Sequence, residues 1–170
     1  MKRLAEIFLA GLMTALVVSG CGGSSTSAST SVSTPRQHVR EALGDTVAAG
    51  GHAGDVKINR VSFSFSGNEV RVLATTPKGG SHGVKCGDLN TGAKAIFEKI
   101  YKDTGWKGGA HIAYQGGLVN GATGRPVPHA RTGAFNMLPA QAKQIDWSND
   151  TALSNVDWST YRDFCHPALQ

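Results

Sequence analysis

Cysteines and histidines are the residues of this chain whose types and spacing could support chemistry. The sequence contains three cysteines and six histidines. Cys86 directly precedes a segment with helical periodicity, and the N-terminus of a helix lowers the pKa of a nearby thiol. One hypothesis therefore makes Cys86 a nucleophile, with His111 as its general base and His129 as an orienting partner. The chain contains neither a phosphate-binding Gly-Lys-Ser/Thr loop nor a His-Glu-x-x-His zinc motif.

The layout of Cys86 before a helix and His111 on a later strand is similar to that of cell-wall cysteine peptidases. This resemblance implies a cysteine hydrolase as an alternative function. The chain departs from that family after the cysteine, where Gly87-Asp88-Leu89 stands in place of the common Ser-Gly. A predicted β-hairpin also precedes the cysteine.

A zinc site is a second alternative, with four candidate ligands of suitable types: His82, Cys86, Cys165 and His166. Cys165 and His166 are adjacent in the chain, which is poor geometry for two ligands of one tetrahedral ion. We therefore expect no metal and no other cofactor.

The N-terminus has the pattern of an export signal. Lys2 and Arg3 precede an uncharged apolar run from Ile7 to Val18, which is too short to span a bilayer. Val18-Ser19-Gly20-Cys21 resembles the lipobox of bacterial lipoproteins. This resemblance implies cleavage before Cys21, attachment of lipid to its thiol, and localisation at the cell membrane on the extracytoplasmic side.

Once Cys21 carries lipid, the other two cysteines form an even pair. In an exported domain the simplest interpretation is a disulfide between Cys86 and Cys165. This bond competes with both the thiol-enzyme and the zinc hypotheses, because each of them needs a free Cys86.

The chain divides into three segments. Residues 1–20 are the predicted signal peptide, and residues 21–34 are the lipidated cysteine with a tether rich in Ser, Thr and Gly, which cannot bury enough apolar surface to fold. Residues 35–170 are then a single extracytoplasmic domain. With 40% hydrophobic residues over its full length, the chain has neither a disordered nor a collagen-like composition.

Hydrophobic periodicity predicts the elements of this domain. Val61, Phe63 and Phe65 alternate with serines, which predicts the first strand of a hairpin that returns through Ala74. Helices are expected from Pro35 and over residues 89–101, and a second strand pair over 111–114 and 132–138. The predicted class is α+β: a small antiparallel sheet of two β-hairpins with packed helices, in the order α-β-β-α-β-β-α.

A short repeat marks the C-terminal segment. Asp146-Trp147-Ser148 recurs as Asp157-Trp158-Ser159, and we expect both tryptophans to hold this segment against the sheet.

Charge and loop length suggest what the domain binds. Residues 36–143 contain 14 basic and seven acidic residues, a balance that would attract an anionic membrane or wall polymer. The few aromatics among the basic residues and the export signal argue against nucleic acid. The long loop 116–129 is a candidate recognition site, with Asn120, Arg125 and His129 as its binding residues.

The sequence thus favours a membrane-anchored lipoprotein that serves as a non-enzymatic binding or accessory module of the cell envelope. Its expected partners are the membrane, through the N-terminal lipid, and an envelope protein or an anionic wall polymer. Two alternatives remain: the cysteine hydrolase, and a phage-encoded lipoprotein that blocks superinfection, which only the chain's size and anchor favour.

Overall fold

The computed structural model describes residues 34–48, 52–53, 56–57, 60–76 and 84–170. The predicted signal peptide, Cys21 and nearly all of the predicted tether lie outside these ranges, as does His82. Their roles therefore stay predictions.

A five-stranded mixed sheet forms the centre of the domain. Its strands, in spatial order, are β3 (Arg60–Ser66), β4 (Glu69–Thr75), β5 (Gly109–Gln115), β8 (Arg131–Met137) and β9 (Arg162–Cys165). β3 and β4 form the first predicted hairpin, with Phe63 opposite Val72. Its turn passes through Gly67, whose φ of 58° favours glycine. β5 and β8 form the second predicted antiparallel pair.

The two hairpins join in a way that the sequence did not indicate. Helix α2 (Cys86–Tyr101) crosses over from β4 to β5, so these two strands are parallel, with Val72 opposite Ile112. The α+β class and the main order of elements are confirmed, whereas the sheet is mixed rather than purely antiparallel. Alternation with a period of two marks a strand but does not encode the direction of its neighbour.

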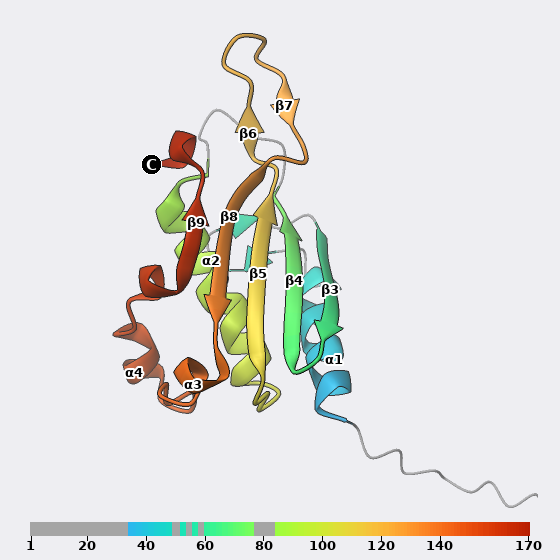
Figure 1. The fold of residues 1–170 in the computed structure, drawn as a ribbon, viewed down its shortest axis with the longest axis vertical. Helices are drawn as coiled ribbons and strands as arrows, with labels where there is room; N and C mark the ends of the chain where they lie inside the picture. The colour runs from blue at the N-terminus through green and yellow to red at the C-terminus, as the bar shows by residue number, and fades with distance from the viewer. Residues whose placement is uncertain (1–33, 49–51, 54–55, 58–59, 77–83) are drawn as a thin grey trace, which may run out of the picture. The chain divides into compact units, whose positions relative to one another are not determined.

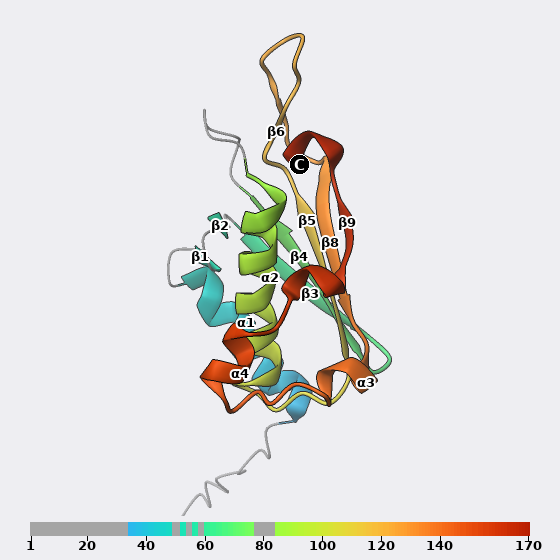
Figure 2. The ribbon, with the colours of Figure 1, turned by 90° about the vertical axis from the view of Figure 1, so that its left-hand side faces the viewer.

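Helices α1 (Pro35–Ala48) and α2 cover one face of the sheet (Figures 1 and 2). Val39 and Leu43 of α1 are buried, as their spacing predicts. The buried stripe of α2 lies within the predicted helix 89–101 and consists of Leu89, Gly92, Ala93, Ile96, Phe97, Ile100 and Tyr101. The core therefore lies between α2 and the inward side chains of the strands.

The C-terminal segment packs against α2. It contains α3 (Pro139–Ala142), α4 (Asp150–Ser154) and two short 3-10 helices, Trp158–Tyr161 and Pro167–Leu169. Trp147 stacks on Tyr101 with ring centroids 4.7 Å apart, and Trp158 stacks on Phe97 at 6.2 Å. Both tryptophans thus hold the segment against α2, and the 3-10 helix that begins at Trp158 also contacts β8 of the sheet.

Two small strand pairs complete the described fold. β1 (His52–Ala53) pairs with β2 (Val56–Lys57), and β6 (Leu118–Val119) pairs with β7 (Pro126–Val127). The β6–β7 hairpin, which we call the arm, projects beyond the end of the sheet between β5 and β8 (Figure 1). No helix of the described residues packs along the sheet face opposite α1 and α2 (Figure 2). We call this the open face.

Candidate binding face on the open side of the sheet

Strand alternation decides which side chains reach the open face. In β4 the buried residues are Val70, Val72 and Ala74, so the residues between them point away from the helices. In β5 the same alternation leaves His111 and Ala113 half-buried on the open face. The side chains that the core does not use are therefore gathered on one surface.

Strand register aligns these side chains in two rows across the sheet. One row, which we call the basic row, consists of Ser64, Arg71, His111 and Asn136 on successive strands. The adjacent row, which we call the alanine row, consists of Ser62, Leu73, Ala113, Ala134 and Phe164. A polar, cationic row thus lies beside an apolar one.

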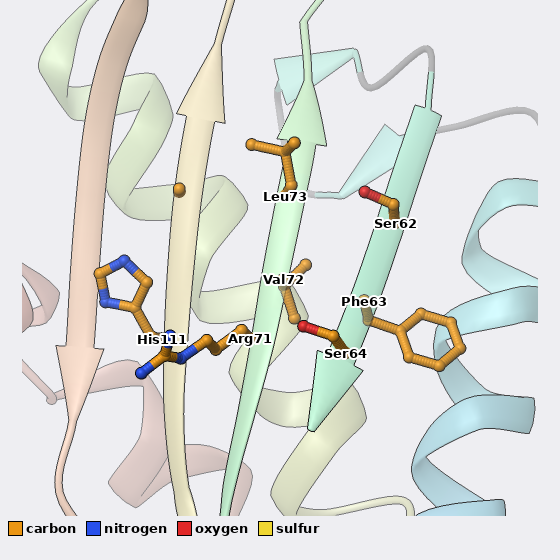
Figure 3. Close-up of a pocket in the computed structure, with 8 residues that line it drawn as sticks. Ser62, Phe63, Ser64, Arg71, Val72, Leu73 and His111 are labelled. Carbon is orange, nitrogen blue, oxygen red and sulfur yellow. The ribbon is translucent and has the colours of Figure 1, made fainter. Parts of the chain in front are cut away.

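A shallow groove of about 300 Å³ lies over β3, β4 and β5 on this face. Both rows contribute to its lining, including Ser64, Arg71 and His111 from the basic row and Ser62 and Leu73 from the alanine row. Figure 3 shows the Arg71 side chain extending over β5 toward His111, whereas Phe63 points away toward α1. The groove is therefore open to solvent, with a cation and several hydrogen-bonding groups at its surface.

Glu69 orients the Arg71 guanidinium. Arg71 Nε donates a hydrogen bond to Glu69 Oε1 at 2.6 Å, and the Arg71 side chain is 58% exposed. A guanidinium carries five N–H donors, and this bond uses one of them. The terminal nitrogens can therefore still meet an anion from solvent. The arrangement suits a phosphate or a carboxylate, which a planar guanidinium binds through two parallel hydrogen bonds.

Cys86 and Cys165 form a disulfide in the structure, joining the start of α2 to β9 across a sequence separation of 79. A sulfur in a disulfide is not a nucleophile, and His111 lies on the open face whereas α2 covers the opposite one. The structure therefore does not bring Cys86 and His111 together as a catalytic pair.

The zinc hypothesis finds no support among the described residues, which contain no group of three or more potential ligands. Cys86 and Cys165 are joined to each other, and His82 lies outside the described residues. His166 accepts a hydrogen bond from Ala168 N through Nδ1 at 3.2 Å, and this bond caps the last 3-10 helix.

The three predicted binding residues of the loop lie on or beside the arm, and all are exposed. Asn120 has a structural role, because its Oδ1 accepts hydrogen bonds from Ala122 N and Thr123 N, both at 3.0 Å. Arg125 contributes to the same turn through its backbone, whose carbonyl accepts from Asn120 N. His129 follows β7 at the base of the arm. The arm tip is thus ordered by its own hydrogen bonds.

One serine pattern also falls outside the described residues. Gly79-Gly80-Ser81-His82-Gly83 has the Gly-x-Ser-x-Gly spacing of serine hydrolases. In that motif the serine lies at a turn that leads directly into a helix, whereas α2 begins only at Cys86.

The sequence interpretation missed Arg71, Ser64 and Asn136 as site residues. A signal was present, because the polar positions of the alternating hairpin must face away from the core. The pattern did not reveal that the described helices leave the open face uncovered. It also did not reveal that strand register aligns these residues with His111.

None of the helices in the described ranges is both long and apolar enough to cross a membrane. No family model, curated protein or solved structure matches the chain.

Proposed function

We propose that this protein is a lipid-anchored extracytoplasmic lipoprotein that binds an anionic component of the cell envelope through the open face. Its role in this proposal is binding rather than catalysis. The observation that carries the proposal is the basic row, which aligns Arg71 and His111 beside hydrogen-bonding groups on the open face.

The chemistry of the face supports an anionic ligand that also carries hydroxyl groups. The Arg71 guanidinium supplies charge and a fixed direction, because Glu69 holds its Nε. Ser64 and Asn136, at the two ends of the row, supply neutral donors and acceptors. A charged polyol or sugar derivative has both kinds of partner group.

The disulfide and the lipobox support the proposed location. Disulfides persist in oxidising compartments outside the cytoplasm, so the Cys86–Cys165 bond agrees with export. The lipobox resemblance supplies an anchor, since two or three acyl chains hold a protein stably at a bilayer. The domain would then act close to the anionic polymers of the envelope.

The binding role is tested by comparing the affinity of an Arg71→Gln variant for purified anionic wall polymer with that of the wild-type protein. We expect affinity to fall about tenfold, because the variant removes a charge-assisted hydrogen bond. Arg40→Gln is the matched control, since Arg40 is exposed on α1, which covers the other face, and the net charge changes equally. Equal losses of affinity in both variants would show that the effect depends only on the total charge of the protein. An unchanged affinity in Arg71→Gln would contradict the proposal.

Metabolic labelling with palmitate tests the anchor separately. We expect label on the wild-type protein and none on a Cys21→Ser variant, which should leave the membrane fraction. Label that persists in Cys21→Ser would contradict lipidation at this residue.

A further inference from the structure

A second cation lies on the open face, on the far side of the alanine row from Arg71. Arg131 pairs with Gln115 across β5 and β8, and its guanidinium carbon lies 5.8 Å from the centre of the Phe164 ring. Phe164 belongs to the alanine row through its pairing with Ala134, which places Arg131 on the open face. A cation over an aromatic ring is held in place by the ring quadrupole.

The segment that builds this part of the face contains no acidic residue. From Thr104 to Ile145 the chain has no Asp or Glu, but it has two lysines, two arginines and two histidines. In the five strands of the sheet the carboxylates are Glu69, which pairs with Arg71, and Asp163 on the edge strand β9. The central strands β5 and β8 therefore carry no carboxylate that would repel an anionic partner.

The positions in which the two guanidinium groups are held favour a ligand with more than one anionic group. Arg71 and Arg131 lie on β4 and β8, two strands apart in the sheet. Because Arg71 pairs with His111 and Arg131 pairs with Gln115, they are also separated along the strands by the interval from His111 to Gln115. Their Cα atoms are therefore roughly 16 Å apart, at about 3.3 Å per residue and 4.8 Å per strand. Glu69 holds the Arg71 guanidinium, and the Arg131 guanidinium lies over Phe164 on the edge strand β9. A chain with repeated charges can contact both groups in these positions, whereas a single phosphate or carboxylate group would draw both side chains out of them.

The alanine row determines which part of the ligand must lie between its anionic groups. Leu73 and Phe164 are its large side chains, 37% and 36% exposed, and between them Ala113 is half-buried and Ala134 is fully buried. A charged group placed on this apolar surface would lose hydration without gaining a partner. The part of the ligand that crosses the row should therefore be uncharged, as the glycerol, polyol or sugar of a phosphodiester polymer is.

We propose that the ligand of the open face is a linear phosphodiester polymer with uncharged polyol or sugar spacers, bound by Arg71 and Arg131 at the same time. This inference rests on the proposed function, because it specifies the anionic envelope component. A nucleic acid is also a phosphodiester polymer, but its bases need aromatic platforms for stacking. The only aromatic side chain of the alanine row is Phe164, and Arg131 already lies over its ring.

The test measures binding of synthetic glycerol phosphate oligomers of one to eight repeats by calorimetry. We expect affinity to rise by at least about 100-fold between the monomer and the octamer, because the second contact becomes intramolecular once the chain spans both arginines. Arg131→Gln should lower octamer affinity at least tenfold and leave monomer binding at Arg71 unchanged. Arg71→Gln should weaken both, and Arg40→Gln should change neither by more than about twofold.

The outcomes separate the two proposals. If Arg71→Gln has no effect on any oligomer, the proposed function itself fails. If Arg71→Gln weakens binding but affinity depends neither on chain length nor on Arg131, only the two-arginine inference fails. Single-stranded DNA that binds as tightly as the glycerol phosphate octamer would also overturn the inference. Near-UV circular dichroism of each variant checks that its fold is retained.

Discussion

The two Asp-Trp-Ser repeats adopt the same local structure. Ser148 donates to Asp146 Oδ1 from its hydroxyl at 2.6 Å and from its backbone N–H at 3.1 Å. Ser159 donates to Asp157 Oδ1 in the same way, at 2.6 Å and 3.0 Å. The sequence repeat therefore marks a repeated turn, which directs each tryptophan toward the aromatic side chains of α2.

These hydrogen bonds lower the pKa of both carboxyl groups, with the serine hydroxyl as the larger cause in each case. We expect Ser159→Ala to raise the pKa of Asp157 toward its ordinary value, as followed by an NMR titration of the carboxyl carbon. Ser154→Ala is the control, because that hydroxyl donates to the backbone carbonyl of Asp150. An unchanged Asp157 pKa in Ser159→Ala would show that the hydroxyl does not hold the carboxylate.

The sign of the stability effect follows from the direction of the shift. A carboxyl group whose pKa is lower in the folded state contributes stability above its unfolded pKa. That contribution is lost as the pH falls through the folded value. Asp146 and Asp157 should therefore make the protein less stable in acid, and Ser159→Ala should reduce this pH dependence while leaving the basic row intact.

At the scale of elements, we expect β9 to depend on the disulfide. The strand forms three residue pairs with β8, and Cys165 joins it to the start of α2. On the chain-entropy description, closing a loop of this length contributes about 4–5 kcal/mol, an upper value for real proteins. The bond also positions Phe164, and with it the second contact of the proposed polymer site.

We expect a Cys86→Ala, Cys165→Ala double variant to lose up to about 4 kcal/mol of unfolding free energy in urea titrations. Amide exchange should accelerate first in β9. At low denaturant the variant should still bind glycerol phosphate monomer through Arg71, but should lose much of the gain with chain length. Unchanged exchange in β9 would contradict the view that the disulfide holds this strand.

An element could be predicted from the sequence where it depends on residues close together in the chain, and could not where it depends on distant ones. The β3–β4 hairpin and the buried stripe of α2 came from local periodicity, which survives in the fold because both are amphipathic. The parallel pairing of β4 with β5 could not be predicted from local periodicity, because it depends on the side to which α2 crosses. The arm was expected as a loop, but its internal hydrogen bonds depend on backbone geometry that the pattern of residues does not contain.

At the scale of the whole molecule, the sequence suggests the charge of the proposed partner but not the position of the candidate site. The basic balance of residues 36–143 indicated an anionic partner. Locating the site required knowing that α1 and α2 cover the same face, which brings Arg71, His111 and Arg131 together on the other one. These residues come from segments far apart in the chain, so no local motif could reveal their alignment.

The division into a packed face and a proposed binding face predicts opposite effects for two phenylalanines. Phe97 is fully buried and lies close to Trp158, Tyr101 and Tyr161, whereas Phe164 is 36% exposed on the open face. Phe97→Ala should lower the unfolding free energy by about 3–5 kcal/mol, since it leaves a cavity at the centre of the core. Because the other elements pack around α2, we expect a single cooperative urea transition at a lower midpoint.

Phe164→Ala serves as the matched variant, with the same change of side chain on the other face. Its stability should change by less than about 1 kcal/mol, as is usual for surface positions. It should nevertheless lower octamer affinity, because Arg131 loses the ring that holds it. Phe97→Ala should keep full octamer affinity under conditions where it is folded. If Phe164→Ala were the more destabilising variant, or if Phe97→Ala alone weakened binding, the open face would be part of the packed core rather than a surface that binds a partner.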